Sequence, residues 1–298
     1  MQDTITFLET IWPDTGPYCI ATKYPKGGYN HKTFDDIEEA AKYALSQDKD
    51  VWFAVGSLKE HQVWCEEKEK FQVRVGTNIN QHKALIADLD CGEGKDYPTQ
   101  PEALQALVKF CTEANFPKPI LVSSGGGWHC YWLLSESIPS TDWQRIGNKL
   151  KRIFAHYGLK ADPTATADVA RVLRVPGTFN CKTDVKRPVK VFKWSETRLS
   201  ASKVESNFDK IIQANKISVP KEKPSNELKS LFEGVQTLDK KADKDQDLIT
   251  SRCPQMQRVV EQGGSVGYEM RGHYLSVVKC TFQHSNSFPL SIVTGKQR

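Results

Sequence analysis

The chain has 298 residues, of which 39% are hydrophobic and 26% charged, and its formal net charge is +5. This composition excludes disordered and fibrous classes, and the length leaves room for two domains. No stretch is apolar enough to span a membrane, and the first residues lack the plan of a signal peptide. Eight cysteines without tight pairing favour a reducing compartment over a disulfide scaffold. We therefore expect a cytoplasmic protein with no membrane partner.

The first predicted elements are a helix over 34–47, a strand over 51–55 and an alternating strand over 71–75. A run of apolar residues then leads into two acids, in the sequence Ala-Leu-Ile-Ala-Asp-Leu-Asp of residues 84–90. This pattern predicts a buried strand that ends at a sheet edge.

The two acids of that strand, Asp88 and Asp90, are predicted to share one face, roughly 7 Å apart. Carboxylates placed this way repel each other, and a divalent cation removes the repulsion. The alternative is a strand end that simply emerges into water before the turn at 91–95. The acid pair thus indicates a metal site only in combination with other motifs.

A helix over 101–111 precedes a predicted β-hairpin over 120–134, whose turn contains Ser123, Ser124 and three consecutive glycines, 125–127. Three glycines are more than a tight turn requires, so we expect close approach of the backbone to an anion. His129 would lie beside this turn and contact a phosphate oxygen. The alternative for His129 is an ordinary half-buried strand histidine.

After a helix over 143–157, two further acids and two arginines lie among small and apolar residues. Asp162 ends a short apolar run that predicts a strand, and Asp168 stands closer to the arginines. The guanidinium groups of Arg171 and Arg174 suit phosphate oxygens, so the segment predicts a metal ligand next to a triphosphate clamp. The alternative is a buried Asp–Arg pair that ties a loop.

Positive charge is concentrated next to these motifs. Between Arg171 and Lys193 seven basic residues oppose Asp184 alone, so this segment carries +6 and the remainder of the chain −1. Such a distribution is typical of a groove for nucleotides or nucleic acids. Lys186, Arg187 and Lys190 are the candidates for contacts with a nucleic-acid backbone.

The last third of the chain has a different composition. Residues 201–250 contain nine lysines and nine acids and predict a charged linker, whereas 251–298 regain apolar residues and predict a small helical module with a helix over 274–282. Cys253, Cys280 and His284 form a candidate structural zinc site. Because no Cys-x2-Cys pair occurs, buried cysteines and surface histidines are the favoured interpretation.

Three of these motifs, in this order, resemble the archaeo-eukaryotic primase superfamily, in particular the primase-polymerases of phages and plasmids. They are the Asp-x-Asp strand, the hairpin from Ser124 to His129 and the acid-bearing segment that continues into Arg-Val-Leu-Arg-Val-Pro-Gly-Thr-x-Asn-x-Lys. The resemblance covers about residues 30–195. It implies an α/β (α+β) fold with a helix-backed mixed sheet, and a catalytic domain over 1–200.

The resemblance also implies roles for individual residues. Asp88, Asp90 and Asp162 would bind two Mg²⁺ or Mn²⁺ ions, with Asp168 as second choice for the third ligand. The implied nucleotide contacts are Ser123, Ser124, Gly126, His129, Arg171, Arg174 and Lys182. The implied activity is that of a DNA primase and DNA polymerase, with His129 counted among the catalytic residues.

The implied partners are a single-stranded DNA template, a primer and nucleoside or deoxynucleoside triphosphates, in a bacterial cell or a phage-infected host. The sequence contains no Gly-x4-Gly-Lys-Ser/Thr loop. A helicase partner is therefore expected within a longer chain or as a separate protein.

Three other classes share part of this pattern. A rolling-circle initiator nuclease needs a His-x-His pair, which is absent among the seven histidines. A two-metal nuclease shares the acids but has less need of a triphosphate clamp. A replication initiator that only binds single-stranded DNA would keep the basic segment without requiring the acids.

Overall fold

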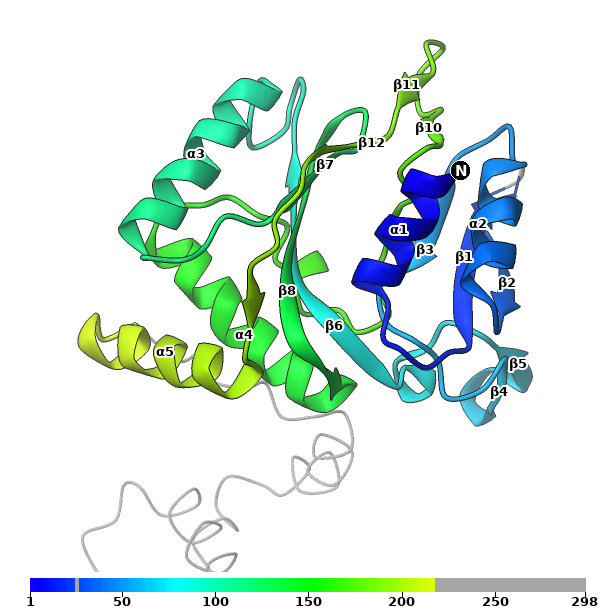
Figure 1. Cartoon of the computed structure of the whole chain (residues 1–298), viewed down its shortest axis with the longest axis horizontal. Coiled ribbons are helices and arrows are strands. Elements are labelled where there is room, and N and C mark those ends of the chain that lie inside the picture. Colours follow the sequence, from blue (N-terminus) through cyan, green and yellow to red (C-terminus); the bar gives the residue numbers. More distant parts are fainter. Residues whose placement is uncertain (25–26, 218–298) are drawn as a thin grey trace, which may run out of the picture. The chain divides into compact units, whose positions relative to one another are not determined.

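Two β-sheets that face one another form the centre of the molecule (Figure 1). The computed structural model describes residues 1–24 and 27–217. The predicted C-terminal module, most of the predicted linker and the candidate zinc residues Cys253, Cys280 and His284 lie outside the described residues. The predicted α+β architecture with a helix-backed mixed sheet is confirmed, and the mixed sheet is the second one described below.

The first sheet has the order β2-β1-β3-β9 and is antiparallel throughout. Its strands are β1 (Tyr18–Lys23), β2 (Tyr29–Phe34), β3 (Val51–Ala54) and β9 (Val172–Arg174). The strand predicted over 51–55 is β3. Strand β9 comes from the segment that carries Arg171 and Arg174, so the fold brings these arginines beside β3, which lies more than 100 residues earlier.

The second sheet carries the predicted acid strand and hairpin. Its order is β12-β7-β8-β6, and the short β13 pairs with β8 in parallel. Its strands are β6 (Gln81–Asp90), β7 (Ile120–Ser123), β8 (Gly127–Pro139), β12 (Lys190–Lys193) and β13 (Arg198–Leu199). In the β6–β8 register Asp88 lies opposite His129 and Asp90 opposite Gly127.

Three helices cover one side of the second sheet, as Figure 1 shows: α3 (Gln100–Glu113), α4 (Ser140–His156) and α5 (Ala201–Ala214). The helices predicted over 101–111 and 143–157 are α3 and α4. Thr99 caps α3 by accepting a hydrogen bond from the backbone N–H of Glu102. Helix α5 occupies the start of the predicted linker, and it packs because Val204 and Phe208 are buried.

Two helices pack near the first sheet. Helix α1 (Gln2–Ile11) was not predicted, and α2 (Ile37–Leu45) lies within the helix predicted over 34–47. Phe7 of α1 contacts Phe53 of β3 and Tyr131 of β8, with ring centroids 5.7 and 5.4 Å apart. The aromatic core thus joins the two sheets through α1.

Two strand predictions are corrected by the structure. The strand expected over 71–75 is the three-residue β5 (Lys70–Gln72), paired in a small hairpin with β4 (Val63–Cys65). The strand expected to end at Asp162 is a loop after α4, because Gly158 takes a positive φ of 72° and turns the chain. Asp162 reaches the site from this loop.

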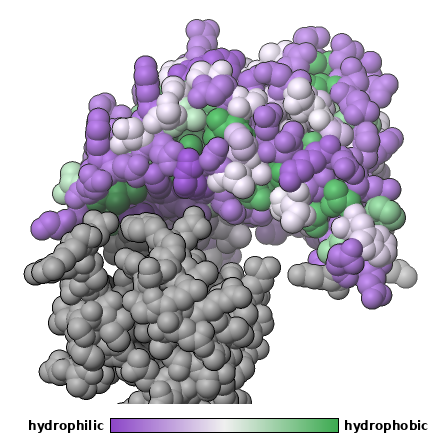
Figure 2. Space-filling view, turned by 90° about the horizontal axis from the view of Figure 1, so that it is seen from below, coloured by the Kyte–Doolittle hydropathy of each residue, from purple (hydrophilic) through white to green (hydrophobic). Residues whose placement is uncertain are grey.

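The remaining short elements connect these parts. They are the 3₁₀ helices η1 (Glu66–Lys68), η2 (Gly76–Asn78) and η3 (Ala165–Ala167) and the hairpin of β10 (Phe179–Asn180) with β11 (Arg187–Pro188). None of the helices in the described part of the chain is both long and apolar enough to cross a membrane. On the face seen in Figure 2, hydrophobic residues lie in separate small groups among hydrophilic ones.

Candidate active site

The centre of the candidate site is a buried acid–histidine pair on neighbouring strands. Asp88 on β6 and His129 on β8 lie opposite each other, and His129 Nε2 is 3.9 Å from Asp88 Oδ1. Their side chains are 15% and 4% exposed. The sequence placed Asp88 at a strand end and His129 at a strand start, and antiparallel pairing of those strands makes the two residues neighbours.

Arg171 joins Asp88 to Asp162. Its Nη2 donates to Asp88 Oδ2 and to Asp162 Oδ2, each at 3.0 Å. The backbone N–H of Asp162 also donates to the carbonyl oxygen of Asp88 at 2.9 Å, which fixes the Asp162 loop against β6. The fold therefore brings Asp88, Asp162 and Arg171 to one point.

Asp90 lies in a different environment from Asp88. Its side chain is 56% exposed and accepts a hydrogen bond from Lys95 Nζ at 2.7 Å. Asp88 and Asp90 are two residues apart on one strand, as expected, and the strand end places Asp88 in the interior and Asp90 at the rim. Asp168 uses Oδ1 to accept from the backbone N–H of Ala170, a local turn contact.

Burial sets the protonation of the central pair. Burial, the largest cause, raises the pKa of Asp88 to about 6, with Arg171 opposing the rise and the negative charges of Asp90 and Asp162 adding to it. Burial also lowers the pKa of His129 to about 3, and the positive charges of Arg174 and Arg171 lower it further. His129 is therefore neutral at pH 7, with one N–H to donate.

Arg174 is held by an acid that the sequence analysis missed. Asp50 Oδ1 accepts from Arg174 Nε at 3.0 Å and from Nη2 at 2.9 Å, and Arg174 lies over the ring of Trp52 at 5.3 Å. The side chains of Asp50 and Arg174 are 13% and 16% exposed. Asp50 precedes β3 in a charged stretch, Gln-Asp-Lys-Asp, that looks like an ordinary turn, so no local signal marks it.

A cavity of about 310 Å³ opens between the two sheets at this point. Asp88, His129, Asp168, Arg171 and Arg174 line it. The lining residues that were not predicted include Tyr29 of β2, Trp52 of β3 and Arg74, which follows β5.

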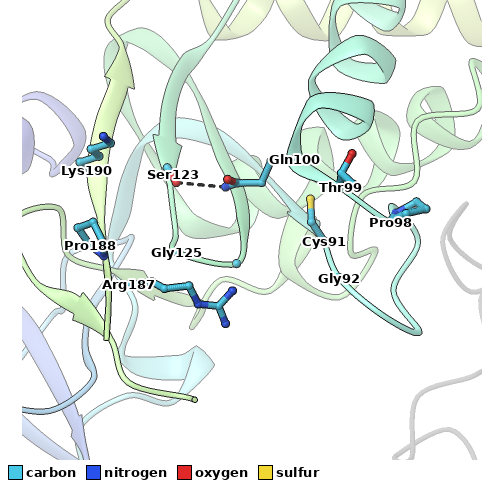
Figure 3. A pocket seen from close by; sticks show the side chains of 11 residues that line it. Cys91, Gly92, Pro98, Thr99, Gln100, Ser123, Gly125, Arg187, Pro188 and Lys190 are labelled. Carbon is cyan, nitrogen blue, oxygen red and sulfur yellow. Dashed lines mark hydrogen bonds between the residues drawn. The ribbon is translucent and has the colours of Figure 1, made fainter. Parts of the chain in front are cut away.

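The glycine turn lines a second cavity, of about 350 Å³, shown in Figure 3. Here Ser123, Gly125 and Gly126 face Arg187 and Lys190, and none of them lines the cavity beside His129. The lining is completed by Cys91, Gly92, Pro98, Thr99, Gln100 and Pro188. The structure thus divides the predicted nucleotide contacts between two cavities.

Packing explains two of the three glycines. A Cβ on Gly127 would lie 2.2 Å from the carbonyl oxygen of Leu89, so β6 and β8 approach closely only with glycine there. Gly125 has a φ of +75°, and its Cβ would lie 2.8 Å from the Cβ of Asn180. Gly126 has no such close contact and is the glycine left for a ligand.

Three other predicted contact residues, Ser124, Lys182 and Lys186, lie outside the linings of the two cavities. Ser124 is 5% exposed, and its carbonyl oxygen accepts from Asn180 Nδ2 at 3.0 Å, so its place in the turn is structural. Lys182 is exposed, and Lys186 Nζ donates to the carbonyl oxygen of Asp48 at 3.0 Å. Neither lysine lines either cavity.

The acids have the chemistry of a divalent-metal site. Carboxylate oxygens are the hard donors that Mg²⁺ and Mn²⁺ prefer, and the like charges around Asp88 are what a cation would neutralise. Within residues 1–24 and 27–217, no three acid, histidine or cysteine side chains are already arranged so that they could hold a metal ion together. Arg171 and Lys95 hold the acids instead, so a metal ion must displace these cations to bind.

Comparison with known proteins gives fold-level likeness alone. No family model and no curated protein matches the chain. The AEP domain of the cyanophage S-2L primase-polymerase is 16% identical, with a TM-score of 0.48 over 70% of this chain and 97% of that one. The primase RepB′ is 13% identical, with a TM-score of 0.45 over 93% and 85%. The polymerase domain of Mycobacterium tuberculosis ligase D in complex with DNA is also 13% identical, with a TM-score of 0.38 over 74% and 89%.

The first of these proteins is described as a primase-polymerase, the second as a primase and the third as a polymerase domain. Their identities and TM-scores are too low to carry residue roles across.

Proposed function

We propose that the chain is a nucleotidyltransferase of the primase-polymerase type, which joins nucleotides on a single-stranded DNA template. The observation that carries the proposal is that Arg171 binds both Asp88 and Asp162 next to His129. Asp88, His129 and Arg171 line one cavity, although these residues come from three separate regions of the sequence. A buried acid cluster beside guanidinium groups is what binding of a polyphosphate with divalent metal requires.

Each residue of the cluster has a role in this proposal. Asp88, Asp90 and Asp162 would hold Mg²⁺ or Mn²⁺, which lowers the pKa of an attacking 3′-hydroxyl and offsets the charge of the triphosphate. Asp162 is preferred to Asp168 because it shares the Arg171 nitrogen with Asp88. Each of the two acids also accepts from a backbone N–H two residues further on.

The cations of the cavity would bind and orient the nucleotide. Arg171 neutralises Asp88 and Asp162 in the structure described, and its guanidinium becomes available to phosphate oxygens when those acids bind metal. Arg174, fixed by Asp50, presents its remaining N–H groups in the same cavity. Neutral His129 would donate a hydrogen bond to a phosphate oxygen.

The second cavity would contact nucleic acid. Arg187 and Lys190 line it together with Ser123 and Gly126, and the nearby Lys182 and Lys186 extend the positive charge. A DNA template and primer are therefore the proposed partners. The resemblance of the motifs to phage and plasmid enzymes is the support for a role in the replication of such an element.

Incorporation of labelled nucleotide on a primed template, with and without Mg²⁺ or Mn²⁺, tests the proposal. We expect metal-dependent extension, and a loss of at least about 100-fold in Asp88→Asn and in Asp90→Asn. Asp96→Asn is the matched control, because Asp96 is an acid in the segment directly after β6. This variant should keep full activity. A folded Asp90→Asn protein with normal activity would contradict the assignment. Shortening of the labelled strand would identify a two-metal nuclease.

A further inference from the structure

Three large aromatic side chains are exposed on the basic segment. Phe179 is 47% exposed, Phe192 56% and Trp194 43%. Each of these aromatic residues lies within a few positions of a lysine or an arginine in the sequence. Phe192 packs on Trp128 with ring centroids 5.0 Å apart, whereas Phe179 and Trp194 line one groove. Large exposed rings that share one hollow are typical of a binding surface. Neither the acid cluster nor the nucleotide cavity uses these residues.

Trp194 and Phe179 line a groove of about 440 Å³ between the start of α1 and the strands β10–β12. The ring of Trp194 is held from behind by the buried Phe7, with centroids 6.3 Å apart. The rest of the lining includes Met1, Asp3, Leu45 and Lys190. The groove therefore offers a fixed, partly exposed ring next to a cation.

The groove adjoins the cavity of Figure 3. Pro188 and Lys190 line both of them, so the segment from Arg187 to Lys190 separates the two hollows and is called the ridge below. Of these two hollows, Arg187 lines only the cavity of Figure 3, and Trp194 lines only the groove. A strand of nucleic acid that crosses the ridge would contact Arg187 and Lys190 and would then reach the ring of Trp194 in the groove.

We propose that this groove receives an unpaired base of single-stranded nucleic acid, which stacks on Trp194 while Lys190 and Arg187 contact the adjacent phosphates. The choice of nucleic acid rests on the proposed function and on the +6 charge of residues 171–193. A duplex offers no free base face, so the ligand is single-stranded. Asp3 also lines the groove and can accept a hydrogen bond from a base N–H.

Binding of fluorescently labelled single-stranded oligonucleotides, followed by anisotropy without metal or nucleotide, tests the inference. One oligonucleotide carries bases throughout, and the other has abasic sugars with the same phosphates. We expect the full-length wild-type chain to prefer the first by about fivefold or more, since stacking on one aromatic side chain has that effect. Trp194→Ala should lose most of this preference, and Trp194→Phe should retain part of it.

Trp64→Ala is the matched control, because Trp64 is 49% exposed on β4 and does not line the groove. It should keep the full preference. The dependence of affinity on salt should be the same in Trp194→Ala as in the wild type, because stacking releases no counterions.

An unchanged base preference in folded Trp194→Ala overturns the inference, as does equal binding of both oligonucleotides by the wild type. Competition by a free nucleoside triphosphate at equal concentration would assign the groove to a nucleotide instead. If instead the proposed function is wrong, metal-dependent extension is absent while the base preference persists.

Discussion

Asp50 and Arg174 form a mostly buried ion pair between residues 124 positions apart, in which one carboxylate oxygen accepts from both Nε and Nη2 of the guanidinium. The same oxygen accepts from the backbone N–H of Cys181 at 3.2 Å. Asp50 therefore fixes the position of an arginine that lines the candidate nucleotide cavity. It also ties the start of β3 to the basic segment beyond β9.

Removal of this pair should affect stability and nucleotide binding together. Asp50→Ala leaves Arg174 without its carboxylate partner, so we expect the free energy of unfolding to fall by about 1–3 kcal/mol, measured by urea unfolding. Arg174→Ala should raise the KM for nucleotide by roughly tenfold or more, because it removes charge-assisted contacts with phosphate.

Asp35→Ala is the control for this pair, since Asp35 is 78% exposed and its contact with His61 is on the surface. Its unfolding free energy should change by less than about 0.5 kcal/mol. If nucleotide KM stays at the wild-type value in Arg174→Ala, the pair is structural and does not serve the cavity.

The third acid can be identified by comparison of two variants. Asp162→Asn should abolish nucleotide incorporation, whereas Asp168→Asn should retain most of it, because Asp162 and Asp88 share one arginine nitrogen. A crystal structure with bound Mg²⁺ checks the assignment directly, with an expected metal–oxygen distance of about 2.1 Å to Asp162. An ion on Asp168 with Asp162 turned away would reverse it.

Three basic residues in and next to the ridge, Lys186, Arg187 and Lys190, should control the salt dependence of DNA binding. If three contacts with phosphate form, the log–log slope of affinity against salt for single-stranded DNA should be about −2, at about −0.7 per contact. Replacement of Lys186, Arg187 and Lys190 by Gln should flatten the slope and reduce primer extension without altering the metal dependence. An unchanged slope would mean that the strand runs over another surface.

His82 should make the fold sensitive to acid. Its ring is stacked on Trp143 with centroids 4.1 Å apart, and Nε2 lies 3.1 Å from the carbonyl oxygen of Val169. Burial lowers its pKa to about 3 from the ordinary value of 6.5. The unfolded chain then binds a proton below pH 6.5 that the folded chain does not, so stability is complete above pH 6.5 and falls as the pH decreases towards 3.

At pH 5 this difference amounts to roughly 2 kcal/mol for one such histidine. Urea unfolding of wild type and His82→Gln at pH 7 and pH 5 measures it, and the variant should lose about that much less on acidification. His129, with a pKa lowered to about 3 as well, remains as a second source of acid sensitivity in both proteins. Equal losses in wild type and variant would show that His82 titrates normally.

Local patterns in the sequence determined most of the second sheet and its helices. Four apolar residues before Asp88 and the Ser/Gly turn before His129 are each readable within a few residues, because strand patterns and turn chemistry depend on near neighbours. These patterns also selected Asp88, Asp162, His129 and Arg171 as residues of one site. They did not predict α1, whose apolar residues are buried by both sheets.

Tertiary structure alone decided how these residues are paired. Arg171 binds Asp88 and Asp162, Arg174 binds Asp50, and the glycine turn opens into a different cavity from His129. The physical reason is that periodicity identifies the face on which a side chain lies but not the distant strand that covers that face. Charges find their partners only when the two sheets close on one another, so the division into two cavities and the position of Trp194 follow from packing.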